Sequence, residues 1–119
     1  MELEIRNLDA PDQTTPMTKG RLDVVSAGGV TVGRASYEPD WRWSKHAGEG
    51  HSWCEVEHVV LVIRGQMRIE MRDGVVRDVG PGDLCAIPPG HDAWVLGGEP
   101  YESLHFHGTE DYAAPGGGE

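Results

Sequence analysis

The 119-residue sequence has few cysteines and no long apolar segment. Its two cysteines, Cys54 and Cys85, are too few for the disulfide framework that stabilises many small exported domains, so we expect reduced thiols. No apolar run approaches the roughly 20 residues that a membrane-spanning helix needs. The first residues also lack the basic-then-apolar order of a signal peptide. These absences favour a cytoplasmic protein that is not embedded in a membrane.

Basic residues are also scarce, and this limits the partners that the chain is expected to bind. The sequence has 10 lysines and arginines and 20 aspartates and glutamates, which gives a formal net charge of −10 at pH 7. Such a charge repels the phosphates of nucleic acids and the surfaces of anionic membranes. We therefore expect neither nucleic acid nor a membrane as a partner.

Glycine and proline, in contrast, are frequent and spread along the chain, with 17 and 8 residues respectively. This distribution favours many short strands over a few long helices, and the length allows one hydrophobic core. The sequence therefore predicts an all-β fold. We expect an N-terminal arm over residues 1–20, a β-barrel over 21–110 and a disordered tail over 111–119.

Turn residues mark the expected strands. Gly28 and Gly29 lie between two β-type runs and predict a hairpin, as does the Asp73–Gly74 pair after an alternating run. A short edge strand is expected over residues 3–6, and residues 41–54 lack a steady period, which indicates a loop or a bent strand. The other predicted strands are residues 22–25, 30–37, 58–63 and 67–71, followed by at least three strands separated by turns at 80–82, 88–90 and 97–98.

Candidate metal ligands concentrate in one stretch, where three histidines and a cysteine fall within thirteen residues: His46, His51, Cys54 and His58. Imidazole and thiolate groups bind divalent transition metals such as zinc, nickel or iron. Successive side chains of a strand point to opposite faces, so two ligands on one strand must be an even number of residues apart. Cys54 and His58, four residues apart, meet this condition.

The histidines differ in their surroundings, and only some are retained as candidates. His51 lies in a glycine-rich loop and is interpreted as a solvated residue. His105 and His107 are interpreted as solvent-facing residues on either side of Phe106. His58 opens an apolar strand, where an unpaired imidazole costs roughly 1–3 kcal/mol. Its partner is a metal ion, a carboxylate such as Glu55 or a backbone carbonyl, and the spacing does not choose among them.

The stretch that follows Asp40 resembles the first motif of the cupin superfamily. That motif runs glycine, five residues, His-x-His, three or four residues, glutamate, six residues, glycine. Asp40 stands at the first glycine, His46 at the first histidine and Gly48 at the second. His58 takes the place of the glutamate, because six residues separate it from the closing Gly65.

The stretch between Gly48 and His58 is longer than the cupin pattern allows. If the insertion is looped out, Cys54 stands where the second histidine of the motif is expected. The resemblance therefore implies that Cys54 replaces this missing ligand.

The second cupin motif runs glycine, five residues, Pro-x-Gly, two residues, histidine. The sequence "GDLCAIPPGHDAW" matches it at Gly82, Pro88 and Gly90, but Ala93 occupies the histidine position. His91, two residues earlier, is the candidate replacement, because residues two apart in an extended segment face the same side.

The cupin resemblance covers residues 24–106 and implies a small jelly-roll barrel, also called a double-stranded β-helix, with a pocket inside it. It implies a pocket for a small molecule and favours a homodimer. The implied cofactor is a divalent transition metal, namely zinc, iron, nickel or manganese. The implied metal ligands are His46, Cys54, His58 and His91, and the implied pocket walls are Trp41, Trp43, Trp53 and Trp94.

Three functions stay open at this point. The first is a metal-dependent cupin acting on a small molecule as an oxygenase, isomerase or lyase. The second is a metal-free cupin that binds or senses a small molecule without catalysis. The third is a metal-free acid–base catalyst with His46 or His58 as the base, oriented by a carboxylate such as Glu55.

Overall fold

The computed structural model describes residues 2–107, and the predicted tail over 111–119 lies outside them. Within the described residues the chain forms nine strands and one short helix, so the predicted all-β class is confirmed. No helix there is long and apolar enough to cross a membrane. The elements are β1 (Gln13–Met17), β2 (Gly20–Ala27), β3 (Val30–Tyr37), α1 (Trp43–His46), β4 (His58–Arg64), β5 (Gln66–Met71), β6 (Val76–Val79), β7 (Leu84–Ile87), β8 (His91–Leu96) and β9 (Tyr101–His107).

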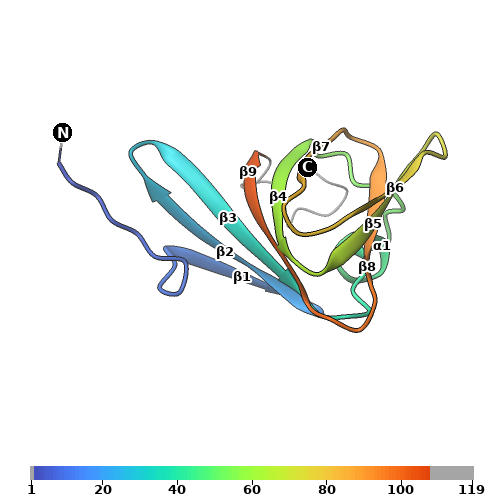
Figure 1. Ribbon diagram of the computed structural model, residues 1–119, viewed down its shortest axis with the longest axis horizontal. Helices are drawn as coiled ribbons and strands as arrows, with labels where there is room; N and C mark the ends of the chain where they lie inside the picture. The colour runs from blue at the N-terminus through green and yellow to red at the C-terminus, as the bar shows by residue number, and fades with distance from the viewer. Residues whose placement is uncertain (1, 108–119) are drawn as a thin grey trace.

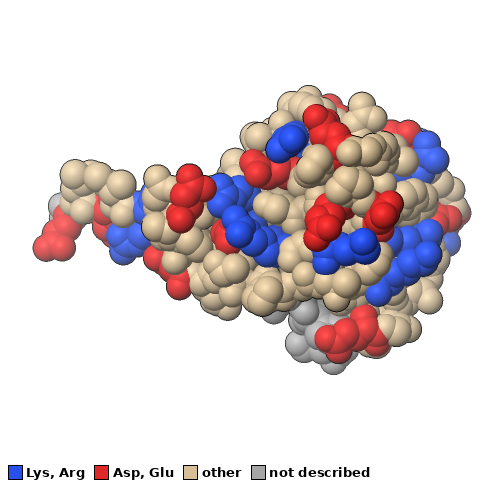
Figure 2. All heavy atoms as spheres, turned by 90° about the horizontal axis from the view of Figure 1, so that it is seen from below, with Lys and Arg blue, Asp and Glu red and all other residues tan. Residues whose placement is uncertain are grey.

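The strands form two antiparallel sheets. The larger sheet has the order β1-β2-β3-β9-β4-β7 and the smaller one has the order β6-β5-β8. Figure 1 shows the two sheets folding around a common interior beside β4, β5 and β8, while the β2–β3 hairpin extends away toward the N-terminus. On the face drawn in Figure 2, acidic and basic side chains lie side by side.

The glycine turns predicted from the sequence are present. Gly28 and Gly29, with φ of 59° and 79°, connect β2 to β3 in the left-handed region that glycine adopts without strain. Gly65, which matches the closing glycine of the first cupin motif, also has a positive φ of 78°. A Cβ atom there would approach the backbone oxygen of Pro100 to 2.5 Å, so no larger residue fits.

The N-terminal arm differs from the prediction. Residues 3–6 are not a strand, and the edge strand is β1, which pairs with β2 from Gln13 to Met17. Because β1 is the outermost strand of its sheet, it tolerates Pro16, which has no N–H to donate. Arg34 of β3 fastens the arm by donating to Asp9 (3.0 Å) and to the buried Asp23 of β2 (3.0 Å).

Strand β9 turns polar side chains inward. It lies between β3 and β4, and its Ser103 and His105 are 0% and 4% exposed, whereas Phe106 is 46% exposed. The prediction that His105 faces solvent is therefore wrong, because the interior of this barrel contains a polar row. The side chain of His107 lies outside the described part of the structure.

Helix α1 is held against β8 by a buried carboxylate. Asp92, 3% exposed, accepts hydrogen bonds from the backbone N–H and the hydroxyl of Ser44 (3.0 and 2.8 Å) and from Arg42 Nε (2.8 Å). The Arg42 guanidinium also lies 4.2 Å from the ring centroid of Trp94 on the same strand. These contacts fix the segment that carries Trp41 and Trp43 at the edge of the barrel interior.

Candidate metal centre

Three potential metal ligands come from two strand starts and the loop before β4. His58 is the first residue of β4, and His91 is the first residue of β8. Cys54 forms an isolated antiparallel bridge with His91, in which the Cys54 N–H donates to the His91 carbonyl (2.7 Å) and the His91 N–H to the Cys54 carbonyl (3.2 Å). The backbone itself therefore brings Cys54 to β8.

The ligand atoms of these three residues form one compact group. They all lie within 4.8 Å of one another, and Cys54 Sγ is 3.6 Å from His58 Nε2. The ring centroids of His58 and His91 are 5.3 Å apart. All three side chains are buried, with 0–4% of each residue exposed. One sulfur and two imidazoles at this spacing form a donor set that fits a divalent transition metal.

The hydrogen bond of His91 determines which of its nitrogens is available. Nδ1 lies 2.7 Å from the Pro88 carbonyl oxygen, and since a carbonyl only accepts, Nδ1 carries the proton. Burial lowers the pKa of His91, so the ring is neutral and its Nε2 lone pair is free to bind. Metal-binding histidines are commonly oriented by such a bond from the opposite ring nitrogen.

Cys54 is a protonated thiol in the absence of a cation. Burial raises its pKa to about 11, because a thiolate without a counter-charge is poorly stabilised in this apolar setting. A metal ion supplies that counter-charge, and its binding would therefore displace the thiol proton.

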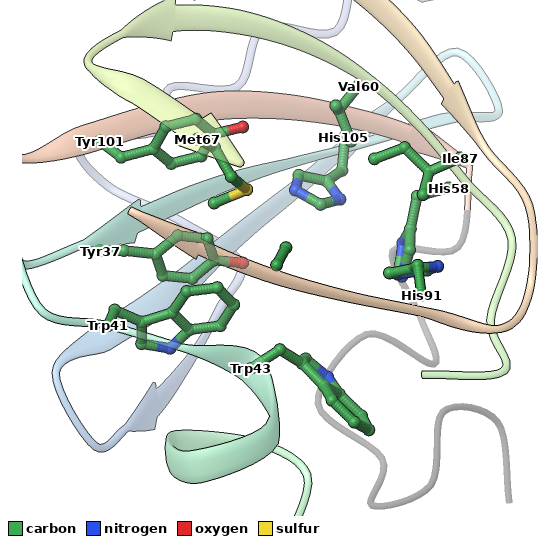
Figure 3. Close-up of a pocket in the computed structure, with 11 residues that line it drawn as sticks. Tyr37, Trp41, Trp43, His58, Val60, Met67, Ile87, His91, Tyr101 and His105 are labelled. Carbon is green, nitrogen blue, oxygen red and sulfur yellow. The ribbon is translucent and has the colours of Figure 1, made fainter. Parts of the chain in front are cut away.

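A small cavity of about 40 Å³ adjoins His58 and His91. In the view of Figure 3, stacked aromatic rings lie on one side of it and the two histidines on the other. The Tyr37 ring lies 3.7 Å from that of Trp41 at an interplanar angle of 2°. In the part of the chain that the structure describes, the residues that line the cavity include no carboxylate, lysine or arginine: Tyr37, Trp41, Trp43, His58, Val60, Met67, Ile87, His91, Ala93, Tyr101 and His105.

His105 is the third imidazole at this cavity, beside those of His58 and His91. Its ring centroid is 5.6 Å from that of His58, and its Nε2 lies 3.3 Å from the Ser103 hydroxyl. Burial lowers the pKa of His105 to about 3, so this ring is neutral at physiological pH. Sequence reasoning missed it, because the alternation of residues 103–106 shows that Ser103 and His105 share a face but does not show that this face is inside.

Comparison with solved structures identifies the fold. The chain is similar to the polyketide cyclase RemF from Streptomyces resistomycificus (17% identity, 87% of this chain and 78% of that chain, TM-score 0.63). It is also similar to a double-stranded β-helix protein from Klebsiella pneumoniae (20%, 87% and 88%, TM-score 0.59) and to the cupin-2 domain protein Rru_A2000 from Rhodospirillum rubrum (17%, 87% and 65%, TM-score 0.56). The chain has the cupin fold. No protein-family model matches the sequence, and no curated protein is significantly similar to it.

Not every residue that the cupin resemblance implied lies at this centre. His46 is the last residue of α1, where its Nδ1 accepts a hydrogen bond from the Arg42 N–H (2.9 Å), and it is not among the three grouped ligands. His46 thus folds back onto the N–H of Arg42, the residue that precedes α1. The set that the structure brings together is therefore Cys54, His58 and His91.

The four tryptophans divide into two pairs. Trp41 and Trp43 line the cavity. Trp94 is half-buried beneath Arg42, and Trp53 lies in a separate surface hollow with its ring centroid 5.9 Å from the guanidinium of Arg72. Trp53 and Trp94 are therefore not walls of this cavity, because each packs with an arginine on the outside of the cupin barrel.

The carboxylate expected beside His58 lies elsewhere. Glu55 is exposed and forms an ion pair with Arg72. The contacts of His58 include the thiol of Cys54 and the rings of His91 and His105. The acid–base arrangement in which Glu55 orients a histidine therefore has no support in this geometry.

Proposed function

We propose that this cupin is metal-dependent, with one divalent transition-metal ion held by Cys54 Sγ and by ring nitrogens of His58 and His91. The observation that carries the proposal is the buried group of three ligand atoms within 4.8 Å of one another. The anchoring of His91 Nδ1 on the Pro88 carbonyl supports it independently, because this bond leaves Nε2 for the ion.

The donor set narrows the choice of metal. A thiolate with two imidazoles suits zinc, iron or nickel, whereas manganese prefers oxygen ligands. Of the four metals that the sequence suggested, manganese therefore fits least well.

The proposed reaction takes place on a small molecule in the adjoining cavity. Three protein ligands leave a coordination position open, and an ion so held supplies Lewis-acid or redox chemistry. The walls of the cavity are mainly apolar, and the His91 ring is oriented by its hydrogen bond to the Pro88 carbonyl. RemF, a polyketide cyclase with this fold, supports the idea that such a barrel accommodates a reacting molecule, although fold alone does not carry function.

Elemental analysis tests the proposal. Untagged wild-type protein purified without added metal is expected to contain about one equivalent of a transition metal. The His58→Ala variant is expected to contain less than about a tenth of that amount. His46→Ala is the matched control, because His46 lies outside the grouped ligands, and it is expected to keep the wild-type content. Equal metal in both variants, or no uptake by the wild type after reconstitution with zinc, iron and nickel, contradicts the proposal.

A further inference from the structure

We propose that the ligand that completes this metal centre is a small oxygen monoanion, with the carboxylate as its chemical class. This inference rests on the proposed function and adds the class of molecule that the centre accepts. The observation behind it is that, among residues 2–107, none of those lining the cavity is an aspartate, glutamate, lysine or arginine.

The charges of the donor set do not balance a divalent ion. Cys54 contributes one negative charge when it binds as a thiolate, whereas His58 and His91 bind as neutral imidazoles. One positive charge is then left over in a buried site. An uncompensated charge in such surroundings is unfavourable, and a monoanion in the open position removes it.

Two carboxylates that act electrostatically on the ligands already have partners. Glu55 and Asp92 are the charged groups that act electrostatically on both Cys54 and His91. Glu55 is paired with Arg72, and Asp92 with Arg42 (2.8 Å). Because neither carboxylate lines the cavity and each is neutralised by an arginine, they leave the extra positive charge largely unbalanced.

The size and polarity of the cavity favour a carboxylate of few atoms. A volume of about 40 Å³ exceeds the roughly 10–15 Å³ that one water requires, and it suits a group of a few non-hydrogen atoms. Figure 3 shows the Tyr37 hydroxyl and the His105 ring projecting into the space beside His58 and His91. These groups are placed to hydrogen-bond the second oxygen of a carboxylate whose first oxygen completes the centre.

The test uses cobalt-loaded full-length protein, titrated with sodium formate and followed by visible absorption. Formamide, the neutral analogue of formate with the same number of non-hydrogen atoms, is the matched probe. Formate is expected to change the cobalt spectrum saturably and to bind at least about tenfold more tightly than formamide. The inference is overturned if formate and formamide bind equally tightly, or if neither of them changes the cobalt spectrum.

A pair of tyrosine variants tests the placement. Tyr37→Phe keeps the stack with Trp41 but removes the hydroxyl, and we expect formate affinity to fall about tenfold. Tyr101 also lines the cavity and stacks on Tyr37, but its hydroxyl is hydrogen-bonded to Ser103, so Tyr101→Phe is expected to lower formate affinity less than Tyr37→Phe does. Equal effects of the two variants contradict the placement.

Cobalt content, measured first, separates this inference from the proposed function. If the protein binds one cobalt ion through a thiolate but does not bind formate, the inference is overturned and the proposed function stands. Protein that takes up no cobalt overturns both.

Discussion

Replacing Cys54 with serine is expected to weaken zinc binding by at least about 100-fold, because the substitution removes the one anionic ligand of the centre. Removing a residue that only hydrogen-bonds a metal ligand lowers metal affinity by about 10- to 100-fold. Removing the ligand itself lowers the affinity further. Competition with a chromophoric chelator measures the affinity of the wild type and of the variant.

Cys85→Ser is the matched control for this experiment. Cys85 is the second cysteine of the chain, is only half-buried and is not among the three grouped ligands. Its replacement is expected to leave the zinc affinity within about a factor of two of the wild-type value. Because Cys54 is fully buried, circular dichroism must first show that Cys54→Ser is folded, and His91→Ala provides a second ligand deletion. Equal affinities of Cys54→Ser and Cys85→Ser would rule out the thiolate as a ligand.

Metal affinity is expected to rise about tenfold for each pH unit between about pH 7 and 9. Burial raises the pKa of the Cys54 thiol to about 11, so the metal-free site holds a proton on sulfur across this range. Burial lowers the pKa of His91 below its usual value of 6.5, so that ring is already neutral. Metal binding therefore releases one proton, that of Cys54, and higher pH favours it.

Calorimetric titration in two buffers with different ionisation enthalpies counts this proton directly. We expect about one proton released per ion for the wild type and a weaker pH dependence for Cys54→Ser. An affinity that does not change with pH would show that the sulfur stays protonated or stays outside the centre.

The β-rich architecture was predictable because local turn chemistry determines it. The glycine pair between β2 and β3 needs left-handed backbone, and the alternating run of β5 ends at the Asp73–Gly74 turn. The inward direction of β9 was not predictable. A period of two places His105 and Phe106 on opposite faces but does not say which face is inside, and here the imidazole is buried and the phenyl ring exposed.

The candidate site was partly predictable. The spacing of Cys54 and His58 indicated a shared face, and the Sγ–Nε2 distance of 3.6 Å agrees with it. The cupin resemblance added His91 but also His46, whose role depends on a helical turn that motif spacing does not reveal. The homodimer and the cytoplasmic location stay predictions, since they depend on a second copy of the chain and on the cell.

X-ray absorption at the zinc edge of the wild-type protein, loaded with one equivalent of zinc, tests the central claim most directly. The proposed centre predicts one sulfur at about 2.3 Å and two imidazole nitrogens at about 2.0–2.1 Å, with the remaining scattering from one light atom. A zinc ion surrounded only by nitrogen and oxygen, with no sulfur, would contradict a centre built from Cys54, His58 and His91.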